Sequence, residues 1–550
     1  MARQDTGIEG LPDEVLTHIF DNADIQSDTL YNTALTSRRL HYFCLPLYLA
    51  RFHILDPLEC CDIICHTPPE GGDQLDALSG LQVALFLPSV KKIVCRFKTL
   101  GDSDDYRTVM KHMHRLHEFI YSLSSVEDVT LVFGNQRCGC CSDLDPGETL
   151  DDALVEWSQT MGQTLNKILE KSCVSITIIG GRYMGHSYSF KSGKKPVKNN
   201  GPLNVIKNLF GKGKLAGFTT ADSGELIDVL RGGTWQFNRT SGTGTAVVLT
   251  PISIAAKSTS TLQSLTIQSM MFIVPPLLHW VVSVLRLRSV QSLLLMNLSV
   301  NRKCWPAVFS LIAENIPHLL ELRLSRLRQL NPMDLFQFIS RFRHLTSLHI
   351  GRDVDGLDSF DLARFPDFPS LISLHAPAGW VFKLLSSQRQ GLLCLESLSI
   401  VYNLRNDGLS HWLQRTSSPS IPMLLNEQRR PLTISLKVHL GNSPGWKMFE
   451  DLNLPSTVDR PKLDDITSLT LILDQEAKSG DMALAQVLPR WTALFYGLRH
   501  LSLKSHPRAL SAAETMMLST QIIQEDKIPL LTSVEVNGVE VYTSESPESS

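Results

Sequence analysis

Two stretches of this 550-residue chain, HLLELRL at residues 318–324 and HLTSLHI at residues 344–350, share one pattern. An apolar residue is followed three positions later by a second, and two positions after that by a third. The last two apolar residues alternate with a polar one, as in a short strand with one buried face. A single such strand leaves its apolar face and its backbone edges uncovered. The pattern therefore predicts a fold in which several copies stack side by side.

The same pattern recurs along the C-terminal part of the chain. The apolar starts at residues 262, 290, 319, 345, 371 and 395 lie 28, 29, 26, 26 and 24 residues apart. Each interval leaves room for a helix, and helical patterns occur at residues 304–315 and 331–342. The remaining copies are TLQSLTI (261–267), SVQSLLL (289–295), SLISLHA (370–376), CLESLSI (394–400), DITSLTL (465–471), GLRHLSL (497–503) and LLTSVEV (530–536).

This period and pattern resemble leucine-rich repeats. The resemblance implies an α/β fold, a solenoid with parallel strands inside and helices outside, over residues 260–540. Family repeats usually carry Asn or Cys three residues past the last strand leucine. Here only Asn403 fills that place, with Asp353 and Asp474 as substitutes. We therefore expect the solenoid to be irregular.

Upstream, residues 51–259 carry a thinner version of the pattern. SVKKIVC (89–95), SVEDVTL (125–131) and SCVSITI (172–178) are more widely spaced, and a helix-like stretch lies between the last two. These residues form either degenerate repeats of the same solenoid or a separate α/β domain.

Three segments look like additions to the repeats. Residues 182–214 hold eight Lys or Arg and no acidic residue, which fits a solvated loop, a contact for an anionic partner, or a nuclear-import signal. Residues 416–430 resemble a second insertion. The polar tail, residues 541–550, is predicted to be disordered.

The N-terminal residues 8–50 predict three short helices. In LPDEVLTHIF (11–20), Pro12 suits the first helical position and the two acidic residues suit the first turn. Residues 27–35 and 38–49 supply the second and third helices, and Pro46 is expected to kink or end the third. Three helices of this size hide too little surface to be stable alone. The segment is either a cap on the next domain or a docking module whose surplus apolar surface belongs to a partner.

The same residues resemble an F-box of the kind found in fungal proteins with leucine-rich repeats. The first part of that motif is matched at Leu11, Pro12, Glu14, Val15, Leu16, Ile19 and Phe20, and the second at Ser37, Arg38, Arg39 and Leu40. DNADIQSDTL (21–30) departs from the family, which more often has an apolar pair and a proline there. The resemblance implies docking to a Skp-family adaptor and through it to a cullin. The implied contacts are Leu11, Pro12, Val15, Leu16, Ile19, Leu35 and Leu40, whereas Phe20 fits the core and the interface equally well.

The resemblance implies a substrate-recognition subunit of a Skp–cullin–F-box E3 ubiquitin ligase, with no bond chemistry of its own. The alternative is a repeat scaffold without a role in ubiquitin transfer. The repeats would hold a target protein, whose identity the sequence does not give. Candidate target contacts are the outward strand positions Gln263, Arg323, His349 and His375.

Composition and motifs give no sign of another class of protein. The net charge of −3 creates no overall attraction to nucleic acid or membrane. We find no signal-peptide pattern and expect a buried helix in the most apolar window, residues 270–287, so the predicted location is cytoplasmic, nuclear or both.

The sequence also shows no motif that indicates a metal site, a nucleotide-binding loop or a catalytic site. The clusters Cys60, Cys61, Cys65 with His66 and Cys138, Cys140, Cys141 lack paired ligand spacing, so free thiols are favoured over a joint metal site. The glycine-lysine segments at 189–196 and 209–215 lack phosphate-loop spacing. We therefore expect neither a metal or cofactor nor an enzyme.

Overall fold

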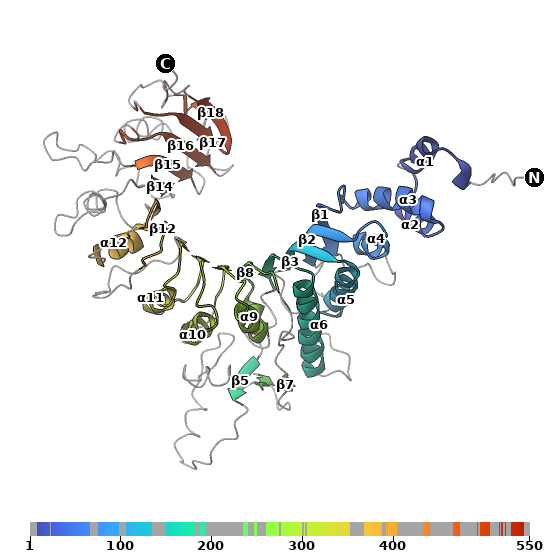
Figure 1. Ribbon diagram of the computed structural model, residues 1–550, viewed down its shortest axis with the longest axis horizontal. Helices are drawn as coiled ribbons and strands as arrows, with labels where there is room; N and C mark the ends of the chain where they lie inside the picture. The colour runs from blue at the N-terminus through green and yellow to red at the C-terminus, as the bar shows by residue number, and fades with distance from the viewer. Residues whose placement is uncertain are drawn as a thin grey trace, which may run out of the picture. The chain divides into compact units, whose positions relative to one another are not determined.

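The computed structural model (Figure 1) divides into two compact units, residues 1–316 with 328–331 (unit 1) and residues 317–327 with 332–550 (unit 2). Each unit combines parallel strands with helices that alternate with them along the chain. The structure describes residues 8–22, 24–65, 75–97, 106–134, 150–181, 188–192, 235–239, 247–249, 260–273, 277–299, 302, 305–351, 368–387, 392, 394–403, 433–440, 466–473, 492, 495–505, 516–517, 519–520, 523, 528 and 530–543.

The three predicted N-terminal helices are present in unit 1. They are α1 (Asp13–Phe20), α2 (Ser27–Ala34) and α3 (Arg38–Arg51), and a 3-10 turn at Ile8–Gly10 precedes them. The Ser37 hydroxyl caps α3 by accepting a hydrogen bond from the Leu40 N–H at 3.3 Å. Of the two expected effects of Pro46, an end of the helix is wrong, because α3 continues to Arg51, whereas a kink stays a prediction. Pro46 has no N–H to donate to the Tyr42 carbonyl, four residues earlier. Both residues are exposed, so water can donate to that carbonyl instead.

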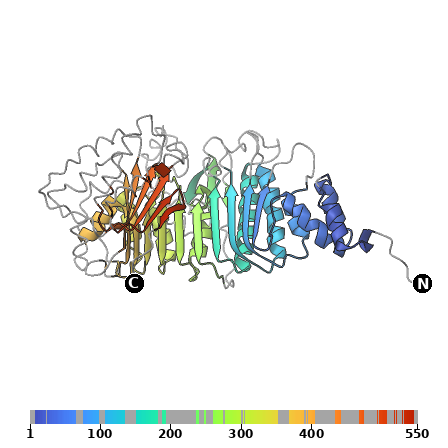
Figure 2. The ribbon, with the colours of Figure 1, turned by 90° about the horizontal axis from the view of Figure 1, so that it is seen from above.

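Six strands of unit 1 lie in one parallel sheet. In spatial order they are β1 (Cys60–Cys65), β2 (Ser89–Phe97), β3 (Ser125–Phe133), β4 (Ser175–Gly180), β8 (Ser264–Gln268) and β9 (Ser292–Met296). Figure 2 shows them side by side. Their inward residues are in register, as in Ile93, Val129, Ile176, Leu265 and Leu293, all fully buried. Since β4 pairs directly with β8, the strands upstream of residue 259 lie in the same sheet as the first regular repeats.

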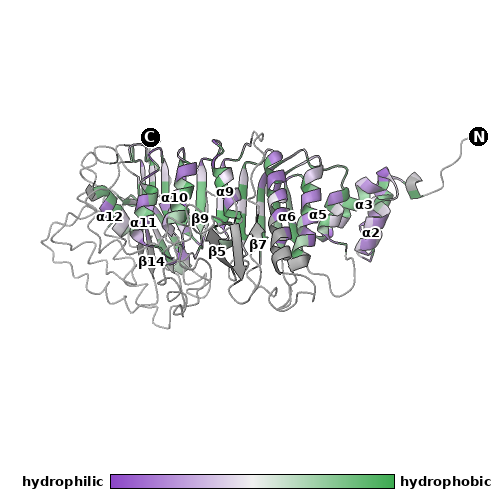
Figure 3. Cartoon of the chain, turned by 90° about the horizontal axis from the view of Figure 1, so that it is seen from below, coloured by the Kyte–Doolittle hydropathy of each residue, from purple (hydrophilic) through white to green (hydrophobic). Residues whose placement is uncertain are grey.

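Helices cover one side of this sheet. They are α4 (Ala77–Val83), α5 (Tyr106–Ser122), α6 (Leu150–Glu170), α9 (Leu277–Leu285) and α10 (Trp305–Asn315). Hydrophilic residues lie along the outward sides of α5 and α6 (Figure 3). The apolar window at 270–287 contains the short turn Met270–Phe272 and α9, whose side chains are mostly buried. Within the described ranges, no helix has the length and apolarity needed to cross a bilayer.

Unit 2 continues the same alternation. Its strands β10 (Glu321–Ser325), β11 (Ser347–Ile350), β12 (Ser373–Pro377), β13 (Ser397–Asn403), β14 (Thr433–Leu440), β15 (Ile466–Leu473), β16 (His500–Ser505) and β17 (Ser533–Val536) are parallel neighbours in that order. Helices α11 (Pro332–Ile339) and α12 (Ala378–Ser387) lie between strands in the chain. All nine copies of the sequence pattern fall on strands with buried inward residues, which confirms the predicted fold class.

Some elements differ from the predictions. β18 (Val539–Thr543) pairs antiparallel with β17, so residues 541–543 belong to a strand and not to a disordered tail. Part of the basic segment 182–214 is also a strand, β5 (Tyr188–Ser192). It pairs in a second, antiparallel sheet with β6 (Trp235–Arg239), which in turn pairs with β7 (Val247–Leu249). The rest of that segment and the insertion at 416–430 lie outside the described residues.

Two of the parallel strands were missed in the sequence. In β14, Pro431 stands where the pattern requires its first apolar residue. In β1, the run CCDIIC reads as a cysteine cluster, although Cys61, Ile63 and Cys65 alternate along the strand and are all buried. Cysteine behaves here as a small apolar residue, which is common for buried free thiols.

Candidate functional site

Helix α1 keeps part of its apolar surface open to water. The Val15 and Ile19 side chains are 41% and 37% exposed, and Pro12 at the start of the helix is exposed too. Val15 and Ile19 are four residues apart, so they lie one above the other on the same face of the helix. We call Pro12, Val15 and Ile19 the α1 strip. An apolar strip on so short a helix is a candidate contact for another polypeptide.

The remaining predicted adaptor contacts divide into two groups. Leu16 and Leu40 are buried in the helical bundle, and Phe20 is buried with them. The structure therefore corrects the prediction for Leu16 and Leu40, which hold the bundle together and have no surface to offer a partner. Leu11 is half-buried, and Leu35 is 53% exposed. The apolar face of α1 is wider than α2 and α3 can cover, so one half of it packs inward and the other half stays open.

Polar contacts hold the helices in place without covering the α1 strip. Arg39 on α3 donates to the Leu11 carbonyl at 2.7 Å and pairs with Asp13 at the start of α1. Arg51 at the end of α3 donates to the carbonyl of Ile25, ahead of α2. Residues of α3 thus fix the start of α1 and the segment ahead of α2. The exposed face of α1 therefore has a defined position in the free chain.

A second exposed apolar group surrounds His41, and the sequence did not reveal it. The ring of His41 is buried, with Nδ1 3.2 Å from the Ala34 carbonyl oxygen and Nε2 3.1 Å from the Leu85 backbone nitrogen. Because Nε2 accepts from the Leu85 N–H, the ring proton lies on Nδ1 and is donated to Ala34. His41 thus joins α2, α3 and the loop after α4. Next to these bonds lie the exposed side chains of Leu35, Tyr42 and Leu85, which we call the His41 patch.

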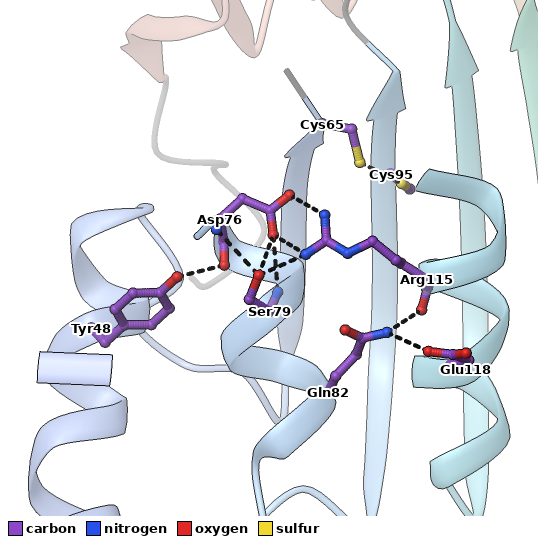
Figure 4. A network of polar contacts seen from close by, with 8 residues as sticks. All are labelled: Tyr48, Cys65, Asp76, Ser79, Gln82, Cys95, Arg115 and Glu118. Atoms are coloured by element: carbon purple, nitrogen blue, oxygen red, sulfur yellow. Dashed lines mark hydrogen bonds and ion pairs between the residues drawn. The ribbon is translucent and has the colours of Figure 1, made fainter. Parts of the chain in front are cut away.

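Helix α3 is fixed to the first repeats by a network around Asp76 (Figure 4). The Tyr48 hydroxyl on α3 donates to the Asp76 carbonyl oxygen at 2.7 Å. The Asp76 carboxylate caps α4 by accepting from the Ser79 N–H at 2.9 Å, and it accepts two hydrogen bonds from Arg115 on α5, at 2.8 and 2.5 Å. Gln82 on α4 donates to the Arg115 carbonyl at 3.0 Å. The network therefore connects α3, α4 and α5.

Helices α3 and α4 also pack closely against each other, at Tyr48 and Gly80. A Cβ atom added to Gly80 on α4 would lie 2.6 Å from a ring carbon of Tyr48, so this position accepts no larger residue without a shift of the helices. Tyr48 itself is fully buried. Together with the Asp76 network, this packing holds α3 in a fixed position against α4 and α5.

Acid is expected to weaken this junction. Burial raises the pKa of Asp76, but the hydrogen bonds and charge of Arg115, together with Ser79, outweigh it and lower the pKa below its ordinary value. A carboxylate of this kind stabilises the fold above its unfolded-state pKa of about 3.9, and that stability is lost as the pH falls through the lower folded value. We expect the urea midpoint to fall below about pH 4, and to fall less in Asp76→Asn, which cannot titrate. An equal acid response in both proteins would contradict this assignment.

The cysteines of β1 do not form a metal site in the described residues. Strand alternation exposes Cys60 and buries Cys61 and Cys65, which separates these thiols as free thiols rather than as one ligand set. Cys65 Sγ lies 3.7 Å from Cys95 Sγ on β2, and both are free thiols. Hydrogen bonds with Cys95 and His112 lower the pKa of the Cys65 thiol. No group of three potential ligand side chains gathers in the part of the chain that the structure describes, and His66 and Cys138, Cys140 and Cys141 lie outside it.

Three of the four predicted target contacts form a row on unit 2. Arg323, His349 and His375 are register neighbours on β10, β11 and β12. The two imidazole rings stack with centroids 3.9 Å apart and an angle of 11° between their planes, and His375 Nδ1 lies 2.7 Å from the Ser399 hydroxyl oxygen on β13. Gln263 is exposed just before β8 and belongs to unit 1. The row is a polar surface on the sheet, open at Arg323 and half-buried at both histidines.

One residue that affects the charge state of this row, Lys437, was not identified from the sequence. Burial, together with the charges of Arg323 and Lys437, lowers the pKa of His349 to about 4, so His349 is neutral at pH 7. Lys437 lies on β14, the strand that the repeat pattern did not reveal. Alternation along β14 would have been the signal for it, since Ile434, Leu436 and Val438 follow a period of two.

Comparisons with known proteins give little beyond this description. No family model matches the chain, and no curated protein matches it. Among solved structures, the chain is similar to one described as "Crystal structure of Rad7 and Elc1 complex in yeast". That similarity has a TM-score of 0.33 with 10% sequence identity and covers 91% of each chain.

Proposed function

We propose that this chain is a substrate-recognition subunit of a Skp–cullin–F-box E3 ubiquitin ligase. The observation that carries the proposal is the α1 strip. Pro12, Val15 and Ile19 belong to the residues that resemble an F-box, and they are the apolar residues of that motif that the fold leaves exposed. A merely structural N-terminal cap would instead have its apolar residues turned toward the repeats.

The proposed contact is a helix laid into an apolar groove of the adaptor. Full burial of an exposed Val or Ile side chain is worth about 1.5–3 kcal/mol, so covering the strip provides a substantial part of a specific interaction. Leu35, an implied contact that directly follows α2 and is exposed, belongs to the His41 patch. The buried Leu16 and Leu40 contribute indirectly, because they hold α1 in the position from which the strip is presented.

The rest of the chain supplies position and recognition. The Asp76 network fixes the docking helices to the first repeats, so an adaptor bound to α1 would be held at a constant place relative to unit 1. A target bound to the strand face would then be kept at high effective concentration near the ubiquitin-loaded enzyme. The chain itself needs no catalytic residue for this role.

Co-purification tests the proposal. Full-length protein is expressed with a Skp-family adaptor and a cullin, captured through a tag, and analysed by size-exclusion chromatography. We expect one complex that contains all three proteins. Adaptor without cullin would favour the alternative, a scaffold without a role in ubiquitin transfer. Failure to retain the adaptor would overturn the docking assignment.

A further inference from the structure

Two thiols lie close together at the edge of the unit 1 sheet (Figure 4). Cys65 is the last residue of β1 and Cys95 lies on β2, and their Sγ atoms are 3.7 Å apart. Cys95 is opposite Ile63 in the strand register, so the two cysteines are diagonal neighbours on the same buried face. Both are free thiols, and each is at most 1% exposed. The sulfur atoms of a disulfide are about 2.05 Å apart, so rotation of the two side chains, with some movement of the short edge strand, brings this pair within bonding distance.

His112 on α5 helps to make Cys65 the more reactive of the two thiols. The hydrogen bond from Cys95 contributes most to lowering the pKa of Cys65, and the hydrogen bond and charge of His112 add to it against the effect of burial. Burial lowers the pKa of His112, but its hydrogen bond with Cys65 and the charge there outweigh this and raise the pKa. Burial raises the pKa of Cys95, which therefore stays a thiol. Because the thiolate is the form that attacks an electrophile, Cys65 is the nucleophile of the pair.

Two other buried cysteines of unit 1 have a different environment. Cys61 lies on the same strand as Cys65, and its thiol donates to the Pro57 carbonyl at 3.2 Å. The thiol of Cys173 donates to a carbonyl of β4 at 3.1 Å. Burial raises the pKa of both thiols to about 12, and buried thiols of this kind are inert. Cys65 and Cys95 differ from them, because each has a second sulfur within reach.

Burial does not exclude a small oxidant from this pair. β1 is the last strand at its end of the sheet, and within the described residues β2 is its only strand neighbour. Strands at the edge of a sheet open locally at a lower free energy than strands in its core. Hydrogen peroxide is close to water in size, so a brief opening of β1 admits it to Cys65.

We propose that Cys65 and Cys95 are a peroxide-sensitive thiol pair that closes to a disulfide and thereby fastens β1 to β2. In the first step, the Cys65 thiolate attacks one oxygen of hydrogen peroxide. An S–O bond forms, the O–O bond breaks, and the departing hydroxide takes a proton from the His112 imidazolium and leaves as water. Cys65 is then a sulfenic acid.

In the second step, the Cys95 sulfur attacks the sulfenic sulfur of Cys65. The S–S bond forms, the S–O bond breaks, and the hydroxyl group leaves as water with the thiol proton of Cys95. Over both steps the two thiols lose two electrons, and the peroxide is reduced to two molecules of water. Neither step involves the α1 strip, so oxidation and adaptor docking are independent of each other.

The disulfide would strengthen the part of the fold that supports the docking helices. Helix α4 packs against β1, and its N-cap is Asp76, the centre of the network that fixes α3. The charge of Asp76 reaches Cys65, which places the thiol pair close to that network. A link between β1 and β2 limits the opening of the edge strand on which α4 packs.

Mass spectrometry of the oxidised full-length protein tests the proposal. The folded protein is treated with hydrogen peroxide, its remaining thiols are alkylated in urea with N-ethylmaleimide, and the peptides are analysed without reduction. We expect a disulfide between Cys65 and Cys95 as the first product, and its loss on treatment with dithiothreitol. Cys95→Ala should stop the reaction at the Cys65 sulfenic acid, which dimedone traps. Cys65→Ala should leave Cys95 as a thiol.

The pH dependence of the reaction tests the part played by His112. At pH 7, His112→Asn should form the disulfide at least about fivefold more slowly, because less of Cys65 is thiolate. Between pH 7 and pH 8.5 the rate of the variant should rise at least about threefold, whereas the wild-type rate should change little, since its thiolate is already formed. Circular dichroism checks that the variant is folded. The same pH dependence in both proteins would overturn the role of His112.

Cys61→Ala is the matched control, because it removes a buried thiol from the same strand. It should leave the yield of the disulfide unchanged. Oxidation of Cys61 as fast as Cys65, a disulfide of Cys65 with another cysteine, or a disulfide that forms only in urea would each overturn the proposal. Hydrogen–deuterium exchange of peptides from β1 should slow at least about threefold after oxidation. Unchanged exchange would show that the disulfide does not fasten the strand.

Discussion

Replacement of Ile19 by Asp is expected to reduce the affinity for a Skp-family adaptor by at least about 100-fold. The variant loses about 2 kcal/mol of apolar burial and places a carboxylate in an apolar groove at a further cost of about 1–3 kcal/mol. Each 1.4 kcal/mol corresponds to about tenfold in affinity. Ile19 is 37% exposed in the free chain, so the substitution should leave the helical bundle folded. Biolayer interferometry with immobilised adaptor measures the change.

Thr17→Asp is the matched control for this experiment. It adds the same charge to the same helix, but Thr17 lies on the side of α1 away from the α1 strip and is exposed. Adaptor affinity should change by less than about threefold. The docking assignment fails if Ile19→Asp binds as tightly as Thr17→Asp while circular dichroism shows that both are folded. A Val15→Asp variant should repeat the loss seen for Ile19→Asp, because Val15 lies on the same face.

Replacement of Asp76 by Ala is expected to destabilise the junction between the docking helices and the repeats by about 3 kcal/mol. The variant removes the N-cap of α4, worth about 1 kcal/mol, and leaves the partly buried Arg115 guanidinium without its carboxylate. In the native fold, 18% of the Asp76 side chain and 28% of the Arg115 side chain are exposed. Hydrogen–deuterium exchange with mass spectrometry measures the effect locally. Peptides from α3 to α5 should lose about 100-fold in protection.

The ion pair of Lys91 and Glu59 provides the comparison. It belongs to the same unit and is as short, at 2.6 Å, but more than half of each side chain is exposed. Pairs of this kind are screened by water and contribute little to stability, so Glu59→Ala should leave exchange in α3 to α5 unchanged. If both variants lose the same protection, or neither does, the Asp76 network does not fix the docking helices as described.

The Asp76 result also bears on the proposed function. A loosened junction should leave adaptor binding to α1 largely intact, because Arg39 and Arg51 hold α1 and α2 on α3 independently of Asp76. Ubiquitin transfer to a bound target should fall, since transfer depends on a fixed distance between adaptor and repeats. Asp76→Ala and Ile19→Asp therefore separate the positioning of the docking helices from their binding.

The candidate site could be predicted only in part. The motif on α1 and the strand positions of Arg323, His349 and His375 were visible in the sequence. The His41 patch was not, because Leu35 and Leu85 are brought together by a buried imidazole from a third element. Lys437 was not visible either, because the repeat pattern fails on β14. The exclusion of Leu16 and Leu40 from the docking surface needed the packing of the helical bundle.

The sequence by itself determined which residues form the repeat strands and which side of each strand is buried. A period of two and a recurrence of 24–29 residues are local properties, and stacking is the way such short strands cover their edges. Only the tertiary structure decided which apolar residues of the docking helices stay exposed and which charges are paired. Those outcomes depend on neighbours that the fold supplies from distant parts of the chain, such as Arg115 for Asp76, and no local pattern encodes them.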